Sequence, residues 1–309
     1  MLLQSSIWSM LEILRNLNSK EQFTLATSCK TLWEFIIQYI PIKHSTDLLN
    51  KKTCKLLKYA RNLHFTTVIP KFLPIHNEVL GGLTEVTINF SNSGISDISD
   101  FKYLGNLTNI TFLNIELRKS WGFSLKSLKS IGKLKKLTEL RLNLRCDDDE
   151  LKVFEFFRKL TDLSILYLDL SNNNHYHYDI INLKYIGWLV NLSELHLNLS
   201  GNNIEYIDCF KWFCRFTKLI VFNVDLSHND IEHCEPLGSI RCSTNLTFVH
   251  VLLYGNVAGE GWIEISPLLD SVCSLNNVSD LSLQFNYWSG FTDMQHLRDY
   301  CDPSGDFFK

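Results

Sequence analysis

Residues 192–204 read LSELHLNLSGNNI, and the spacing of their leucines, L-x-x-L-x-L-x-L, recurs along the chain. Isoleucine, valine and phenylalanine replace leucine in several copies. Self-similarity at a fixed period is typical of repeat architectures, in which each copy is one structural unit. We therefore expect a stack of similar units. At intervals of 26 to 32 residues, the copies begin at Leu83, Ile110, Leu137, Leu163, Leu192, Leu219, Leu246 and Val278.

Each repeat is predicted to contain one strand and one helix. The alternating end of each copy matches a half-buried strand, whose side chains point in turn to the core and to solvent. The stretches between copies, such as residues 124–134 and 150–160, place apolar residues three and four apart, which predicts a helix. Asparagine and aspartate often follow the strand, as in residues 170–173, where they favour a turn. Because one unit cannot bury its apolar face alone, we expect stacked units to share a core beneath a curved parallel sheet.

These repeats resemble the leucine-rich-repeat family, of which the ribonuclease-inhibitor type is the familiar example, over roughly 230 residues. The resemblance implies an α/β horseshoe with the parallel sheet on the concave face and the helices on the convex face. It also implies a protein-interaction module, although the motif maintains a core and does not specify a ligand. We expect this domain at residues 46–309, with a degenerate opening repeat at 46–82, repeats at 83–292 and a cap at 293–309.

Residues 1–45 do not follow the repeat and predict a small all-α segment of short amphipathic helices. Within them the pattern Glu12-Ile13-Leu14-x-x-Leu17 is followed by Phe23, Leu25, Cys29-Lys30 and Trp33. This pattern resembles the F-box motif, which implies binding to a Skp-type adaptor of a cullin-based ubiquitin ligase, with a substrate held by the repeats. Ser5 and Ser6 stand where that family usually has Leu-Pro. The alternative is a helical cap for the solenoid, in a scaffold with no ubiquitin connection. The resemblance assigns adaptor binding to Ile13, Leu14, Leu17, Phe23 and Trp33.

The concave face is the predicted binding surface for a protein partner. In a strand of the form L-x-L-x-L, the x positions face away from the core and form rows across the sheet. Tyrosine and histidine in these rows are candidate anchors, because aromatic side chains bury a large area at low entropic cost. The alternative is a solvated surface with no binding role. The predicted contact residues are Arg141, Asn143, Tyr167, Asp169, His196, Asn198, Asn223, Asp225, His250 and Tyr254.

Composition narrows the class of protein. The chain has 309 residues, of which 45% are hydrophobic and 20% charged, so it can bury a large core. Residues 201–309 hold six Lys and Arg against fourteen Asp and Glu, which argues against a nucleic-acid binder. The sequence shows neither an apolar run long enough to cross a membrane nor a signal peptide. Its nine scattered cysteines favour free thiols, so we expect an intracellular monomer of the cytoplasm or nucleus.

Catalytic and metal-binding motifs are missing from the sequence. It contains neither G-x-x-x-x-G-K-[ST] nor G-x-S-x-G nor H-E-x-x-H, so phosphate cradles, nucleophile elbows and zinc-protease helices have no local support. His175 and His177 lie close together, but a metal site needs three or four ligands. We therefore predict a chain that is not an enzyme and has no cofactor and no metal.

Overall fold

The computed structural model of the chain describes residues 42–44, 62–65, 82–91, 97–117, 125–144, 150–173, 180–256, 265–285 and 288–301. The predicted F-box-like segment, with Ile13, Leu14, Leu17, Phe23 and Trp33, lies outside these residues. Most of the predicted opening repeat at 46–82 lies outside them as well, as do His175 and His177. The described residues are therefore chiefly those of the predicted repeats.

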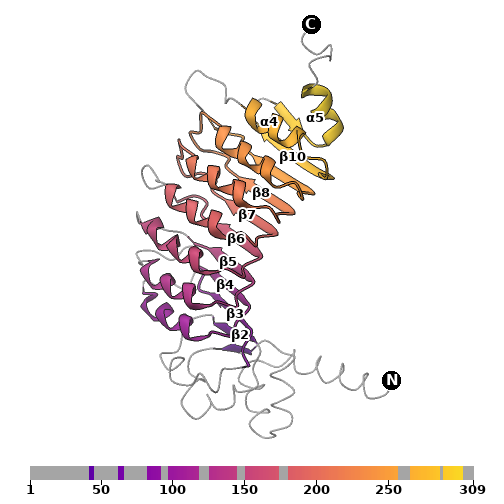
Figure 1. The fold of residues 1–309 in the computed structure, drawn as a ribbon. Coiled ribbons are helices and arrows are strands. Elements are labelled where there is room, and N and C mark those ends of the chain that lie inside the picture. Colours follow the sequence, from indigo (N-terminus) through magenta and orange to yellow (C-terminus); the bar gives the residue numbers. More distant parts are fainter. Residues whose placement is uncertain are drawn as a thin grey trace, which may run out of the picture.

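The strands form one open sheet of eleven strands, in which they follow one another in chain order (Figure 1). Every neighbouring pair from β1 to β10 is parallel, and β11 (Trp288–Phe291) runs antiparallel to β10. The predicted α/β leucine-rich-repeat solenoid is thereby confirmed. The parallel strands are β1 (Ile42–His44), β2 (Asn62–Phe65), β3 (Glu85–Asn89), β4 (Phe112–Glu116), β5 (Glu139–Asn143), β6 (Ile165–Asp169), β7 (Glu194–Asn198), β8 (Val221–Asp225), β9 (Phe248–Leu252) and β10 (Asp280–Phe285).

A helix lies between each pair of successive strands from β3 to β10, and these helices cover one face of the sheet (Figure 1). The last of them, α4 (Ser266–Cys273), is an α-helix, and α5 (Met294–Cys301) follows β11. The other helices are 3₁₀-helices, whereas the spacing of apolar residues predicted the α-helical period. They are η4 (Ser99–Asn106), η5 (Leu125–Lys133), η6 (Glu150–Lys159), η7 (Ile180–Trp188), η8 (Asp208–Arg215) and η9 (Glu235–Cys242).

Close stacking of the repeats explains the 3₁₀ form. Neighbouring strands lie about 4.8 Å apart, whereas packed α-helices need axes about 8–10 Å apart. The tighter 3₁₀-helix reduces this mismatch between the two faces of the solenoid. Glycine allows the approach: a Cβ added at Gly187 would lie 2.7 Å from Cβ of Trp212 in the next helix. The sheet consequently stays open and does not curl into a closed ring (Figure 1).

The repeat leucines form the core between sheet and helices. In β7, Leu195 and Leu197 are buried, whereas Glu194, His196 and Asn198 are partly exposed on the other face. The same alternation occurs in the neighbouring strands, which confirms the period of two read from the sequence. Large aromatic side chains fill the space toward the helices, and the fully buried ones among them include Phe154, Phe157, Phe210, Phe213, Phe216 and Phe222.

Four buried asparagines, which we call the asparagine ladder, join successive repeats where the chain leaves the strands. Each donates from Nδ2 to the carbonyl oxygen at the strand end of its own repeat and of the preceding one. The Oδ1 atoms of the last three accept backbone N–H groups of the preceding repeat. The sequence predicted turn formers at the first three of these positions, and the structure shows that they also link the repeats. The members are Asn173, Asn202, Asn229 and Asn256.

Candidate functional site on the concave face

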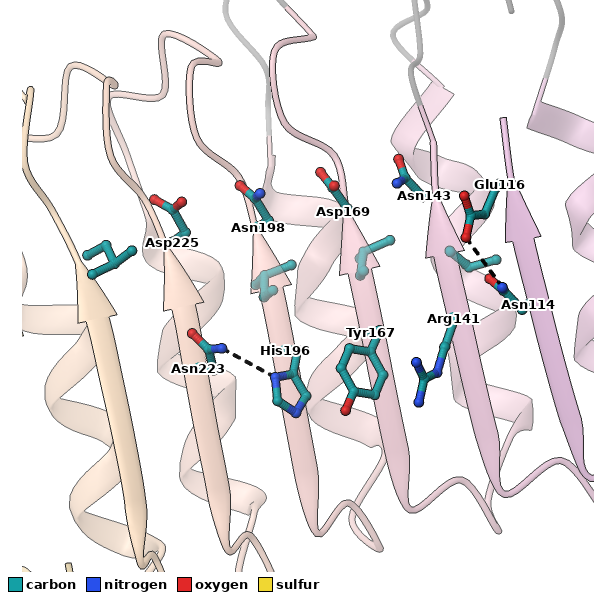
Figure 2. A pocket seen from close by; sticks show the side chains of 14 residues that line it. Asn114, Glu116, Arg141, Asn143, Tyr167, Asp169, His196, Asn198, Asn223 and Asp225 are labelled. Atoms are coloured by element: carbon teal, nitrogen blue, oxygen red, sulfur yellow. Dashed lines mark hydrogen bonds between the residues drawn. The ribbon is translucent and has the colours of Figure 1, made fainter. Parts of the chain in front are cut away.

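The parallel register places the predicted contact residues side by side on the face that the helices leave open. Arg141, Tyr167, His196, Asn223 and His250 occupy equivalent positions on β5 to β9. Two residues further along these strands, a second row holds Asn143, Asp169, Asn198 and Asp225 (Figure 2). Tyr254 follows β9 in a turn and has an exposed fraction of 42%. The predicted positions are thus on one surface, and their role in binding stays a prediction.

Three of these side chains form what we call the planar stack: Arg141, Tyr167 and His196. The rings of Tyr167 and His196 are nearly parallel, at 4° and with their centroids 4.1 Å apart. On the other face of the tyrosine ring, Cζ of Arg141 lies 4.3 Å from the ring centroid. Such a spacing follows from the register, because adjacent strands are about 4.8 Å apart. Sequence reasoning predicted Tyr167 and His196 as separate anchors and did not foresee their stacking.

Polar contacts hold the two ends of the planar stack. Nε of Arg141 donates to Oε1 of Glu139 at 2.6 Å, which orients the guanidinium group. At the other end, Nδ2 of Asn223 and Nδ1 of His196 are 3.3 Å apart (Figure 2). The amide nitrogen of Asn223 can act only as a hydrogen-bond donor. Nδ1 of His196 is therefore the acceptor, and the proton of the neutral imidazole lies on Nε2. Both ends of the stack are therefore fixed before any partner arrives.

Burial shifts the pKa values of both rings. It lowers the pKa of His196 below the usual 6.5 and outweighs the opposing effect of Glu194, whose Oε2 lies 3.7 Å from Nε2. Burial also raises the pKa of Tyr167, partly offset by the positive charge of Arg141. Near neutral pH both rings are therefore uncharged. Arg141 supplies the only full positive charge of the planar stack.

A row of alternating acids and amides runs beside the planar stack, and we call it the acid–amide row. Serines two residues further along the chain fix several of its members. The backbone N–H of Ser171 donates to Oδ1 of Asp169 at 3.0 Å, and Ser227 donates both its N–H and its hydroxyl to Oδ1 of Asp225. From β4 to β8 the row reads Glu116, Asn143, Asp169, Asn198 and Asp225.

The planar stack and the acid–amide row enclose a hollow of about 430 Å³ on the concave face. Eight of the ten predicted contact residues line it, and His250 and Tyr254 do not. His250 instead contacts Asp280, with Nε2 2.8 Å from Oδ1, while the ring of Tyr254 meets that of His228. Asn114 and Glu116 line the hollow as well, although they were not among the predicted contacts. Their positions in the same two rows were the signal that would have identified them.

Other kinds of site receive no support from the described part of the chain. Within it, no group of three or more His, Cys, Asp and Glu side chains could hold a metal ion. The helices described there are all too short or too polar to cross a membrane. None of the six cysteines described there forms a disulfide; Cys209 and Cys234 are buried, and Cys214 and Cys242 are exposed.

Comparison with known proteins gives a likeness of fold only. No family model matches the sequence, and no curated protein matches it. An internalin C2 of Listeria monocytogenes is 23% identical with a TM-score of 0.38, covering 65% of this chain and 81% of the internalin. A second Listeria monocytogenes internalin is 18% identical with a TM-score of 0.41, covering 80% and 74%. A leucine-rich-repeat protein of Leptospira interrogans is 19% identical with a TM-score of 0.48, covering 84% and 64%.

Proposed function

We propose that this chain is a non-enzymatic protein-interaction module that binds its partner on the concave face across β4 to β8. The observation that carries the proposal is the hollow, which is lined by the planar stack and the acid–amide row. Aromatic and arginine side chains dominate the binding energy of many interfaces. Because Arg141, Tyr167 and His196 are held by mutual contacts, they would lose little conformational freedom on binding. These features of the hollow support its proposed role in binding.

We expect Tyr167→Ala to reduce partner binding about tenfold or more, because it removes the middle of the planar stack and the largest aromatic surface there. Tyr206→Ala is the matched control, since Tyr206 has an exposed fraction of 72% and does not line the hollow. The measurement is quantitative affinity capture from extracts of cells that produce the protein, with wild type and both variants shown to be folded by circular dichroism. Partners retained equally by Tyr167→Ala and wild type would contradict the proposal.

We further propose that the interaction module is the substrate receptor of a cullin-based ubiquitin ligase, acting inside the cell as a monomer. The support is the F-box-like pattern of the sequence, with Ile13, Leu14, Leu17, Phe23 and Trp33 as adaptor contacts. The alternative is a repeat scaffold with no ubiquitin connection. The two differ in whether residues 1–45 bind a Skp-type adaptor.

A pull-down with a purified Skp-type adaptor separates these alternatives. We expect the intact chain to capture the adaptor and Leu14→Asp to lose capture, because a charge in an apolar contact is costly to bury. Val190→Asp places the same charge at a position with an exposed fraction of 47% and is expected to capture the adaptor normally. Failure of the folded wild-type chain to bind the adaptor would reject the ligase role and leave the scaffold.

A further inference from the structure

We infer that the acid–amide row binds an extended, basic segment of another protein in which lysine or arginine recurs at every third residue. This inference rests on the proposed function, since it names the chemistry of the partner that the concave face would hold. It follows from the charge of the hollow, the spacing of its carboxylates and the way their side chains are fixed.

The charge of the hollow favours a positively charged partner. Three carboxylates, those of Glu116, Asp169 and Asp225, line it against a single guanidinium group, that of Arg141. That guanidinium is already bonded to Glu139, a further carboxylate on the opposite side of the planar stack. Since complementary potentials steer association and select partners, a basic segment fits this face and an acidic one is repelled.

The register gives the spacing of these carboxylates. Glu116, Asp169 and Asp225 lie on β4, β6 and β8 at equivalent positions, so each is two strands from the next. Two strand spacings amount to about 9.6 Å. A polyproline II segment has three residues per turn and advances about 9.3 Å in that turn. Such a segment, running across the strands, brings every third side chain to one face and in step with the carboxylates.

A segment in the β conformation does not match this spacing. Every second side chain of such a segment lies on the same face, so successive side chains on that face are about 6.7 Å apart. The mismatch to the carboxylate spacing then grows with each successive side chain. The polyproline II form stays in step over the whole distance from Glu116 to Asp225, where the difference is only about 0.6 Å.

The amides between the carboxylates suit the backbone of the same segment. A polyproline II chain makes no internal hydrogen bonds, so its carbonyl oxygens need outside donors. Asn143 and Asn198 stand on the strands between the acids. Oδ1 of Asn198 accepts the N–H and the hydroxyl of Ser200, which directs the Nδ2 donors of the amide away from that serine. We assign these amides to the partner's carbonyl groups and the carboxylates to its basic side chains.

The length of the row limits the motif. On β9 the equivalent position is Leu252, and on β10 it is Gln284, so the acids end at β8. On β3 the position is Asn89, so they begin at β4. The expected motif therefore has three basic residues, each separated from the next by two residues without positive charge.

Two labelled peptides of equal composition test the spacing directly. One repeats Lys-Pro-Ser three times, and the other places its three lysines together at one end, followed by the same prolines and serines. We expect the full chain to bind the first peptide about tenfold more tightly at physiological salt, measured by fluorescence anisotropy. Equal affinity for the two peptides would overturn the inference, because charge alone would then explain the binding.

Variants of the row locate the binding. Asp169→Asn with Asp225→Asn removes two charges and keeps the oxygen acceptors for Ser171 and Ser227, so the fold is expected to persist. We expect this double variant to bind both peptides equally. The matched control is Asp208→Asn with Asp270→Asn, on η8 and α4 of the opposite face, which is expected to keep the tenfold preference. A preference that survives in the first double variant would overturn the inference.

The capture experiment with Tyr167→Ala distinguishes this inference from the proposed function. Absence of the peptide preference, together with partner capture that still depends on Tyr167, rejects the basic motif and leaves the concave binding role intact. Absence of both rejects both. The preference together with Tyr167-dependent capture supports both, and the captured partners are then expected to contain the spaced basic motif.

Discussion

Asn229→Ala is expected to lower the free energy of unfolding by about 4 kcal/mol, because buried backbone groups of two successive repeats lose their hydrogen bonds to this side chain. Nδ2 of Asn229 donates to the carbonyl oxygens of Leu199, Leu226 and Ser227. Its Oδ1 accepts the N–H groups of Asn202 and Ile204. Alanine is too short to replace any of these bonds, and the side chain it replaces is almost fully buried. Urea unfolding followed by circular dichroism measures the loss.

Two further substitutions show whether the asparagine ladder is the cause. Asn245 also donates from Nδ2 to a backbone carbonyl, that of Thr217, but it is exposed, so Asn245→Ala is expected to cost less than about 1 kcal/mol. Asn229→Asp keeps an acceptor for the N–H groups and loses the donor for the carbonyls, so it too is expected to be strongly destabilising. Equal losses for Asn229→Ala and Asn245→Ala would argue against a special role of the ladder.

Phe213→Ala is expected to lower the free energy of unfolding by about 4 kcal/mol, through the cavity it leaves between the sheet and η8. Phe213 is fully buried, and its ring centroid lies 4.7 Å from that of Phe210 and 4.9 Å from that of Phe216. Phe222 of β8 meets the same ring edge-on at 6.4 Å. The side chain therefore joins the helix of one repeat to the strand of the next. Thermal and urea unfolding provide the measurement.

Phe213→Leu is the control for cavity formation. Leucine keeps most of the apolar volume, so this variant is expected to lose less than about 1.5 kcal/mol. A leucine variant as unstable as the alanine variant would show that the aromatic contacts, and not the filled volume, stabilise this part of the core.

The sequence was sufficient to predict the sheet and its exposed rows. A period of two decides which side chains face the core, and a repeat of nearly constant length keeps equivalent residues in register. For this reason the sequence alone assigns Tyr167 and His196 to equivalent positions on adjacent strands, as the structure confirms. Their contact was not predicted, because it depends on side-chain torsions that the repeat pattern does not determine.

The form of the helices and two of the candidate anchors were beyond sequence reasoning. Apolar residues three and four apart follow the period of an α-helix. The 3₁₀ form depends instead on how closely neighbouring repeats stack, as Gly187 against Trp212 illustrates. His250 was grouped with the other anchors by its position in the row. Its ring instead contacts Asp280 on the next strand and does not line the hollow.

The alternation of acids and amides has a consequence for how such a surface changes in evolution. Because the charge pattern repeats every second strand, its natural unit is a pair of repeats. Gain or loss of one repeat within β4 to β8 would reverse the phase of the pattern and set like groups on adjacent strands. Gain of a pair would preserve the alternation of acids and amides and lengthen the surface by one charge. The binding surface can therefore change its length without losing its pattern only in steps of two repeats.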